Sequence, residues 1–246
     1  MTSYAATVSR RLPRGWAHFA LQFGIWMGFY AAYQVVRGAA DRDVIKAFTN
    51  GEWVISTERK LGALIEPSLQ RAVEGSSFLI ELTSYTYWLS QFAIVGIALL
   101  WTYFKHYERF AVLRNWLIVA NLLGLIGYVL MPTAPPRMFP AAGFTDTLAE
   151  HAAVNHDSGL IAFAANPYAA MPSLHAMDAL IVTLTMVALV RSPIARVMWL
   201  AWAPWVWFSV MSTGNHYWLD VAAGVVLAGI AAAIVLVPRL LRRRQT

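Results

Sequence analysis

The chain contains no cysteine and has few charged residues. Without cysteine, disulfide bonds and thiolate metal sites are excluded. Only 13% of its 246 residues are charged, whereas a soluble domain usually has about 25%, and 59% are hydrophobic. This imbalance excludes an ordinary soluble domain and predicts a polytopic membrane protein. We expect residues 1–246 to form a single integral membrane domain, with a core over about residues 58–237.

Six apolar segments are long enough to be membrane-spanning helices, which need roughly 20 mostly apolar residues. They comprise residues 15–36, 78–104, 115–131, 174–190, 197–213 and 217–237. The predicted fold is therefore all-α: a bundle of six transmembrane helices with an extracytoplasmic loop and interfacial helix region. The first segment exceeds the ~7–15 apolar residues of a secretory signal peptide, so we expect it to be a retained anchor.

The formal net charge of +6 is concentrated at the ends of the apolar segments. In membrane proteins, lysine and arginine gather in the cytoplasmic loops, and with six spans every basic cluster falls on one side. We therefore expect an integral plasma (inner) membrane protein with basic cytoplasmic tails over 1–14 and 239–246. The basic residues form no nucleic-acid-binding face, so no nucleic-acid partner is expected. The basic residues in these clusters are Arg10, Arg11, Arg14, Lys105, Arg109, Arg114, Arg191, Arg196, Arg239, Arg242, Arg243 and Arg244.

We expect residues 41–77, residues 132–173, the turn around Gly214 and the active site to lie on the opposite, extracytoplasmic side. Residues 58–73 have apolar residues at helical spacing and predict an amphipathic helix bent near Pro67, either interfacial or packed on the bundle. In the long loop over 132–173, three prolines exclude helix at the start and keep Arg137 close to the third span. Apolar residues farther along this loop suggest a lid. His151, His156 and Asp157 match no strong metal-ligand spacing, so no metal site is expected.

His216 and Asp220 are four residues apart at the start of the sixth apolar segment. On a helix this spacing places both side chains on one face, within reach of each other. A carboxylate bonded to one imidazole nitrogen fixes the tautomer and makes the other nitrogen a better base or nucleophile. The alternative is a purely structural His–Asp pair that caps a helix.

A second polar patch, residues 172–175, opens the fourth apolar segment. Ser173 is the expected N-cap, and a helix N-terminus offers free amide groups that can hold a phosphate. His175, in the first turn, could donate a proton to a leaving oxygen. Arg137 offers a planar fork of donors suited to phosphate. The alternatives are a capped helix with a chance histidine and an arginine that binds lipid headgroups.

The sequences Pro172-Ser173-Leu174-His175 and His216-x-x-x-Asp220 resemble two motifs of the type 2 phosphatidic acid phosphatase superfamily. With Leu174, and with residues 213–217 reading Thr-Gly-Asn-His-Tyr, the chain looks more like the branch that contains inositol phosphorylceramide synthase. The resemblance implies metal-independent chemistry without a cofactor. His216 would attack phosphorus and form a phosphohistidine, Asp220 would orient it, and His175 would serve as acid and base.

The resemblance also implies that Ser173 and the following amides hold phosphate oxygens and that Arg137 matches the arginine of the first motif. Two cations of the family pattern are absent, because Leu130 and Val210 stand at their positions. Lys60, Arg59 or Asn215 could replace them. With fewer cations to bind phosphate oxygens, the site favours a phosphodiester or diphosphate over a phosphomonoester.

The sequence therefore predicts a membrane lipid phosphatase or phosphotransferase that acts on a lipid phosphate, diphosphate or phosphodiester. Two alternatives stay open: a synthase-like transferase that uses a polyol such as inositol as acceptor, and a catalytically dead bundle that binds or moves lipids. The donor lipid, the acceptor and the oligomeric state are left open.

Overall fold

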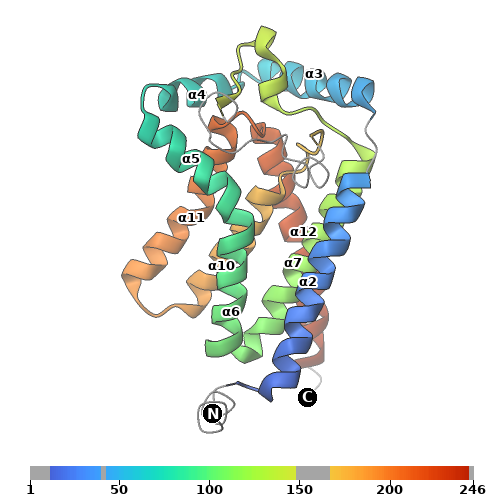
Figure 1. Cartoon of the computed structure of the whole chain (residues 1–246), viewed down its shortest axis with the longest axis vertical. Coiled ribbons are helices and arrows are strands. Elements are labelled where there is room, and N and C mark those ends of the chain that lie inside the picture. The colour runs from blue at the N-terminus through green and yellow to red at the C-terminus, as the bar shows by residue number, and fades with distance from the viewer. Residues whose placement is uncertain (1–11, 40–42, 148–166, 244–246) are drawn as a thin grey trace, which may run out of the picture.

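The structure, a computed structural model, describes residues 12–39, 43–147 and 167–243. Long helices running up and down form the body of the molecule (Figure 1). They are α2 (Gly15–Ala39), α5 (Ser77–Leu89) continued through the π-helical turn η1 (Ser90–Ile94) into α6 (Val95–Lys105), α7 (Tyr107–Leu130), α10 (Leu174–Leu189), α11 (Pro193–Ser212) and α12 (Trp218–Arg243). Each apolar segment expected to be a span thus forms a helix.

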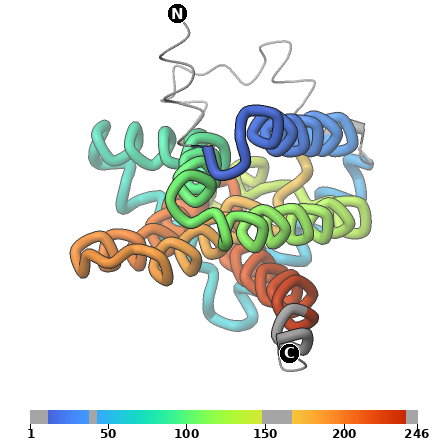
Figure 2. The backbone as a smooth tube through the Cα atoms, turned by 90° about the horizontal axis from the view of Figure 1, so that it is seen from below, coloured from blue at the N-terminus to red at the C-terminus, as the bar shows by residue number. Residues whose placement is uncertain are grey.

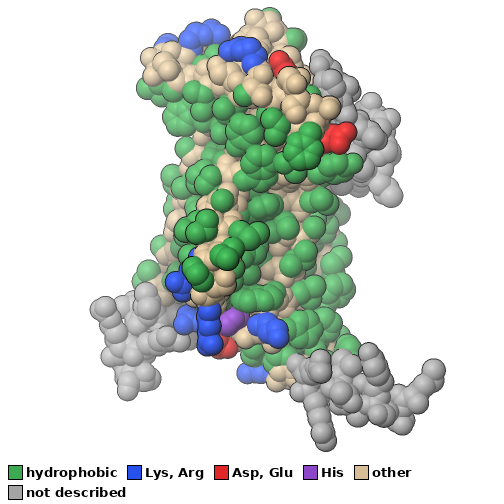
Figure 3. Space-filling model, turned by 90° about the vertical axis from the view of Figure 1, so that its left-hand side faces the viewer, with side chains coloured by type: hydrophobic (Ala, Val, Ile, Leu, Met, Phe, Trp, Pro, Cys, Tyr) green, Lys and Arg blue, Asp and Glu red, His purple; other side chains and the backbone are tan. Residues whose placement is uncertain are grey.

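Four helical stretches are long and apolar enough to cross a membrane: Ser77–Lys105, Tyr107–Leu130, Pro193–Ser212 and Trp218–Pro238. The apolar helix α10 is shorter, with 16 residues. Only 22–39% of each span is buried inside the protein, so most of its apolar surface faces outward. In Figure 3, hydrophobic side chains cover the middle of the visible face, and lysine and arginine gather at its two ends. This is the surface of a membrane protein, because a soluble protein rarely exposes so large an apolar area.

The helix α10 lies at the centre of the bundle, where it packs against α7, α11 and α12. Viewed from below, α2 and α11 lie on opposite sides (Figure 2), and α2 packs on α7. Buried apolar residues such as Leu113, Leu117, Met177, Ile181 and Val182 form the core between these helices. The bundle thus holds the start of α10 close to the start of α12.

Two helices, α3 (Val44–Lys60) and α4 (Glu66–Glu74), cross the upper end of the bundle (Figure 1). The expected single amphipathic helix over 58–73 is therefore wrong. The chain turns at Gly62, whose φ of 65° favours glycine, and Pro67 occupies the first turn of α4, where proline is well tolerated. Glu58 and Glu66 are fully buried, although the sequence places Glu66 on the polar side of that helix.

The loop after α7 returns across the same end of the molecule. Thr133 forms a parallel bridge with Ala169, which joins the start of the loop to the segment before α10. The predicted proline-rich extended stretch ends in a short 3-10 turn, Pro136–Met138, which contains Arg137. The remaining part of the predicted lid, with His151, His156 and Asp157, lies outside the described residues.

Candidate active site

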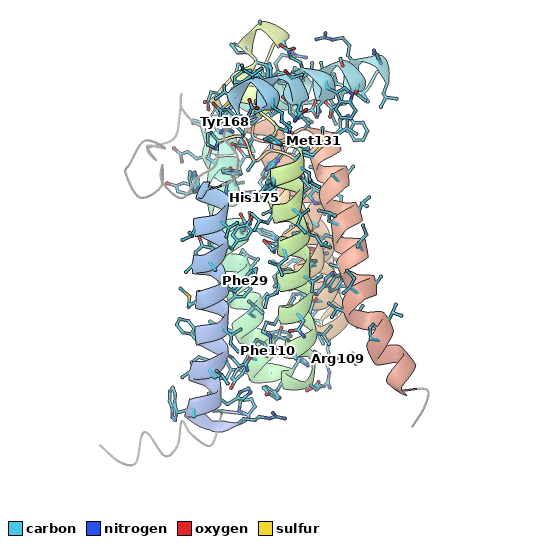
Figure 4. The ribbon with its side chains drawn as sticks, turned by 90° about the vertical axis from the view of Figure 1, so that its right-hand side faces the viewer. Phe29, Arg109, Phe110, Met131, Tyr168 and His175 are labelled. Carbon is cyan, nitrogen blue, oxygen red and sulfur yellow. The ribbon has the colours of Figure 1, made fainter. Side chains whose placement is uncertain are left out.

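A small polar cleft, partly open to solvent, lies at the upper end of the bundle. Its lining brings together the two histidines of the sequence motifs, His175 and His216. Figure 4 shows His175 near the upper end of the bundle, far from Arg109 and Phe110 near the lower end. The polar lining residues include Arg37, Tyr87, Arg137, His175, Asn215 and His216. The histidines thus share one cleft.

The imidazole rings of His175 and His216 lie close together in the lining of this cleft. Their centroids are 5.7 Å apart and their planes are inclined by 59°. The ring of Tyr87 stacks on His175 with a centroid separation of 4.5 Å. A phosphorus atom between the two rings would therefore have one imidazole on each side, while stacking limits the movement of His175.

The Nδ1 atom of His216 lies against two acceptors. The carbonyl oxygen of Ala170 is 2.8 Å away, and Oδ2 of Asp220 is 3.4 Å away. Because neither atom can donate, Nδ1 of the neutral ring carries the proton and the lone pair is on Nε2. The sequence identified Asp220 as the orienting group but missed the nearer Ala170 carbonyl, which depends on the loop before α10.

Asp220 also connects the starts of α10 and α12. Its Oδ2 accepts a hydrogen bond from the Tyr217 amide at 2.9 Å, and its backbone carbonyl accepts one from the Ser173 amide at 2.9 Å. The close approach requires glycine at 224, because a Cβ atom there would be 2.4 Å from the Ser173 carbonyl oxygen. These contacts hold the two motifs together.

Ser173 is the N-cap of α10, as the sequence predicts. Its hydroxyl accepts a hydrogen bond from the Ala176 amide at 3.2 Å, and the residue is fully buried. Ser173 is not among the residues that line the cleft. A direct contact between Ser173 and phosphate remains a prediction.

Arg137 is held on the other side of the cleft. Its Nη1 donates to Oδ1 of Asn215 at 2.5 Å, and its Nε lies 3.8 Å from Oδ2 of Asp146. The Arg137 amide donates to the Gly214 carbonyl. These contacts orient the guanidinium group beside His216. Asn215, expected as a possible phosphate ligand, orients Arg137 and lines the cleft itself.

The sequence missed a pair of buried glutamates at the start of α12. Glu66 Oε1 accepts a hydrogen bond from the Trp218 amide at 2.6 Å, and Glu58 Oε1 accepts one from the Leu219 amide at 3.1 Å. These are free amides of the first turn of α12. Burial and the neighbouring carboxylate raise the pKa of Glu58 to about 9, and burial also raises the pKa of Glu66. The pair therefore holds a proton at neutral pH.

Arg37 is a further residue of the site that no sequence motif indicated. It lies near the end of α2 and lines the same cleft as Arg137 and the histidines. A cation near the end of an apolar segment is an ordinary interfacial feature, so only its position in the bundle distinguishes it. Arg59 and Lys60, the cations proposed from the sequence, are exposed at the end of α3 and do not line the cleft.

Comparison with known proteins places this arrangement in a family. A family model described as the PAP2 superfamily matches residues 52–234. The fold is similar to the crystal structure of Aquifex aeolicus LpxE, with a TM-score of 0.50 and 15% identity over 70% of this chain and 92% of that chain. At this identity the likeness concerns the fold alone. No curated protein sequence matches the chain significantly.

Proposed function

The chain belongs to the PAP2 superfamily, and on this premise we propose that it is a membrane enzyme that removes or transfers the phosphoryl group of a lipid phosphate or diphosphate. The observation that carries the proposal is the convergence of His175 and His216 on one cleft, with Nε2 of His216 left as the basic nitrogen. Arg137 beside them provides positive charge for the phosphate oxygens.

In the first proposed step, Nε2 of His216 attacks phosphorus. The N–P bond forms, the bond from phosphorus to the leaving oxygen breaks, and His175 donates a proton to that oxygen. The Ala170 carbonyl and the Asp220 carboxylate stabilise the positive charge that develops on the imidazole ring. The product is a phosphohistidine and a neutral lipid alcohol, or a lipid monophosphate when the substrate is a diphosphate.

In the second proposed step, His175 accepts the proton of an incoming water molecule as the water oxygen attacks phosphorus. The N–P bond breaks, and its electron pair returns to Nε2 of His216. Phosphate leaves and both histidines regain their starting protonation states. A positioned general acid–base group contributes about 10²–10⁴-fold to the rate.

The proposed orientation follows from charge. Lys105, Arg109, Arg191 and Arg196 lie at the end of the bundle opposite the cleft, and short cytoplasmic loops are rich in such residues. We propose that all six apolar helices cross the membrane, with both termini in the cytoplasm and the cleft on the extracytoplasmic face. A lipid substrate would then enter from the outer leaflet, and its chains would stay in the bilayer.

Purified protein in lipid nanodiscs provides the test. A panel of prenyl, glycero- and sphingo-phosphates is offered with and without inositol, and free phosphate and new lipids are measured. We expect release of phosphate from at least one lipid phosphate and its loss in His216→Ala. Near-normal turnover by His216→Ala would refute the covalent route.

The same experiment separates the acceptors. A new phosphorylated lipid or polyol that appears only with inositol would identify a transferase, whereas phosphate release in both conditions identifies a phosphatase. Absence of any turnover, together with no ³²P-labelled phosphohistidine after an alkaline quench, would instead support a lipid-binding bundle without activity.

A further inference from the structure

Arg37 has an unusual environment for an arginine near the end of a membrane helix. Its Nε atom is buried, and no described residue accepts a hydrogen bond from it. Its charge lies near four tyrosines, Tyr30, Tyr33, Tyr87 and Tyr128. A guanidinium group cannot lose its charge as a lysine can, and a buried charge without a partner is costly. A permanent cation is thus kept where the described protein supplies no carboxylate for it.

The charges that line the cleft also favour the binding of an anion. Arg37, Arg137, His175 and His216 contribute to its lining, and no described aspartate or glutamate does. Asp220 lies behind His216, fully buried, and Asp146 contacts the Nε of Arg137. Two permanent cations and two imidazoles around a small polar cleft form a site for an anion.

We propose that Arg37 is a second phosphate-binding cation, an inference that rests on the proposed function. The site would then take a terminal phosphate group that carries two negative charges. Arg37 and Arg137 line the same cleft from different elements, α2 and the turn Pro136–Met138. In this proposal both bind oxygens of one phosphate. Arg37 takes the part of a cation that Leu130 and Val210 cannot supply. The helix that carries it precedes the family-matched residues 52–234.

This inference changes the expected substrate class. With Arg137 alone, the cleft suits the single negative charge of a phosphodiester. With Arg37 as well, it suits a lipid phosphomonoester or the terminal phosphate of a lipid diphosphate, because each additional charge-assisted hydrogen bond favours the dianion. A phosphodiester would leave one guanidinium with poor compensation and would place its second ester group among polar residues.

Binding of inorganic phosphate tests the proposal without requiring turnover. The melting temperature of the protein in nanodiscs is followed by tryptophan fluorescence at increasing phosphate, with chloride keeping the ionic strength constant. Because phosphate binds the folded protein, it raises the melting temperature according to its affinity. We expect Arg37→Gln to weaken phosphate binding about tenfold or more and to affect dimethyl phosphate, a monoanion, much less. Arg37→Lys, which retains the charge but not the fork, should lie in between.

A purely structural role for Arg37 predicts a different pattern. Arg37→Gln would then lower the melting temperature without phosphate and leave phosphate affinity within twofold of the wild type, which would overturn the proposal. So would the absence of phosphate binding by the wild type, or an equal loss in the Arg59→Gln or Lys60→Gln variants. Arg191→Gln, at the opposite end of the bundle, is the matched control and should bind phosphate normally. If Arg37→Gln does not fold, the comparison of Arg37→Lys with the wild type decides.

The result is separable from the proposed function. Phosphate binding that depends on Arg37, in a protein that turns over no lipid phosphate, would contradict the enzyme and leave this inference intact. Turnover of a lipid phosphate by the wild type, with unchanged phosphate affinity in Arg37→Gln, would contradict the inference and leave the enzyme intact.

Discussion

The buried pair Glu58 and Glu66 predicts that the protein loses stability as the pH rises. Both carboxyl groups bind amides at the start of α12, and Asp220 lies in the same turn. Three buried carboxyl groups around one helix turn cannot all be charged without a large electrostatic penalty. The pair therefore keeps a proton, and the pKa of Glu58 rises from 4.5 to about 9.

The direction of the effect follows from proton linkage. Between pH 4.5 and about 9, folded Glu58 holds a proton that the unfolded chain has released. The stabilisation is complete below the lower value, declines as the pH rises, and is lost above the higher value. One such proton changes the free energy of unfolding by about 1.4 kcal/mol per pH unit. The contribution of Glu58 should therefore fall by about 3 kcal/mol from pH 6 to pH 8.

Glu58→Gln is the informative substitution. Its amide oxygen can still accept from the Leu219 amide, and its NH₂ group can donate to Glu66 as the protonated acid does. We expect this variant to be as stable as the wild type near pH 4, to be more stable at pH 6 and more so at pH 8, and to show a flatter pH dependence. The measurement is unfolding followed by the fluorescence of the eleven tryptophans at several pH values.

Glu52→Gln is the matched control, because Glu52 is an exposed residue of the same helix. It should leave the pH dependence of the wild type unchanged. A Glu58→Gln variant that keeps the full pH dependence, or that is less stable than the wild type at pH 8, would refute the idea of a protonated carboxyl pair.

Three further predictions concern the cleft. Asp220→Asn should lower kcat by about 10²–10⁴-fold, because the charge beside His216 is lost, while Tyr217 keeps its acceptor; steady-state kinetics check this, and a loss below tenfold would contradict it. His175→Ala should slow substrates with poor leaving groups far more than those with very good ones in the first step, measured as single-turnover rates; equal losses would exclude its role as an acid. Gly224→Ala should destabilise the protein by about 1–3 kcal/mol and lower kcat, because the new Cβ displaces the Ser173 carbonyl; normal unfolding and kinetics would contradict this close contact.

The sequence by itself determined the helices and the identity of the two motifs. Apolar runs of about 20 residues form helices in lipid because the backbone must satisfy its own hydrogen bonds there. The turn from polar loop to apolar run marked the N-cap Ser173. The spacing of four residues predicted that Asp220 lies beside His216, although His216 precedes α12 and only Asp220 lies on the helix. These are local properties, so neighbouring residues are enough to predict them.

Only the tertiary structure decided what surrounds the motifs. The Ala170 carbonyl bonds to His216 because the loop before α10 returns there, and Glu58 and Glu66 are buried because α3 and α4 cross the start of α12. Arg37 reaches the cleft because α2 packs on α7, although no motif contains it. Such contacts join residues that are distant in the chain, and the physical chemistry of each residue alone is compatible with many partners. Packing of the helices selects among them.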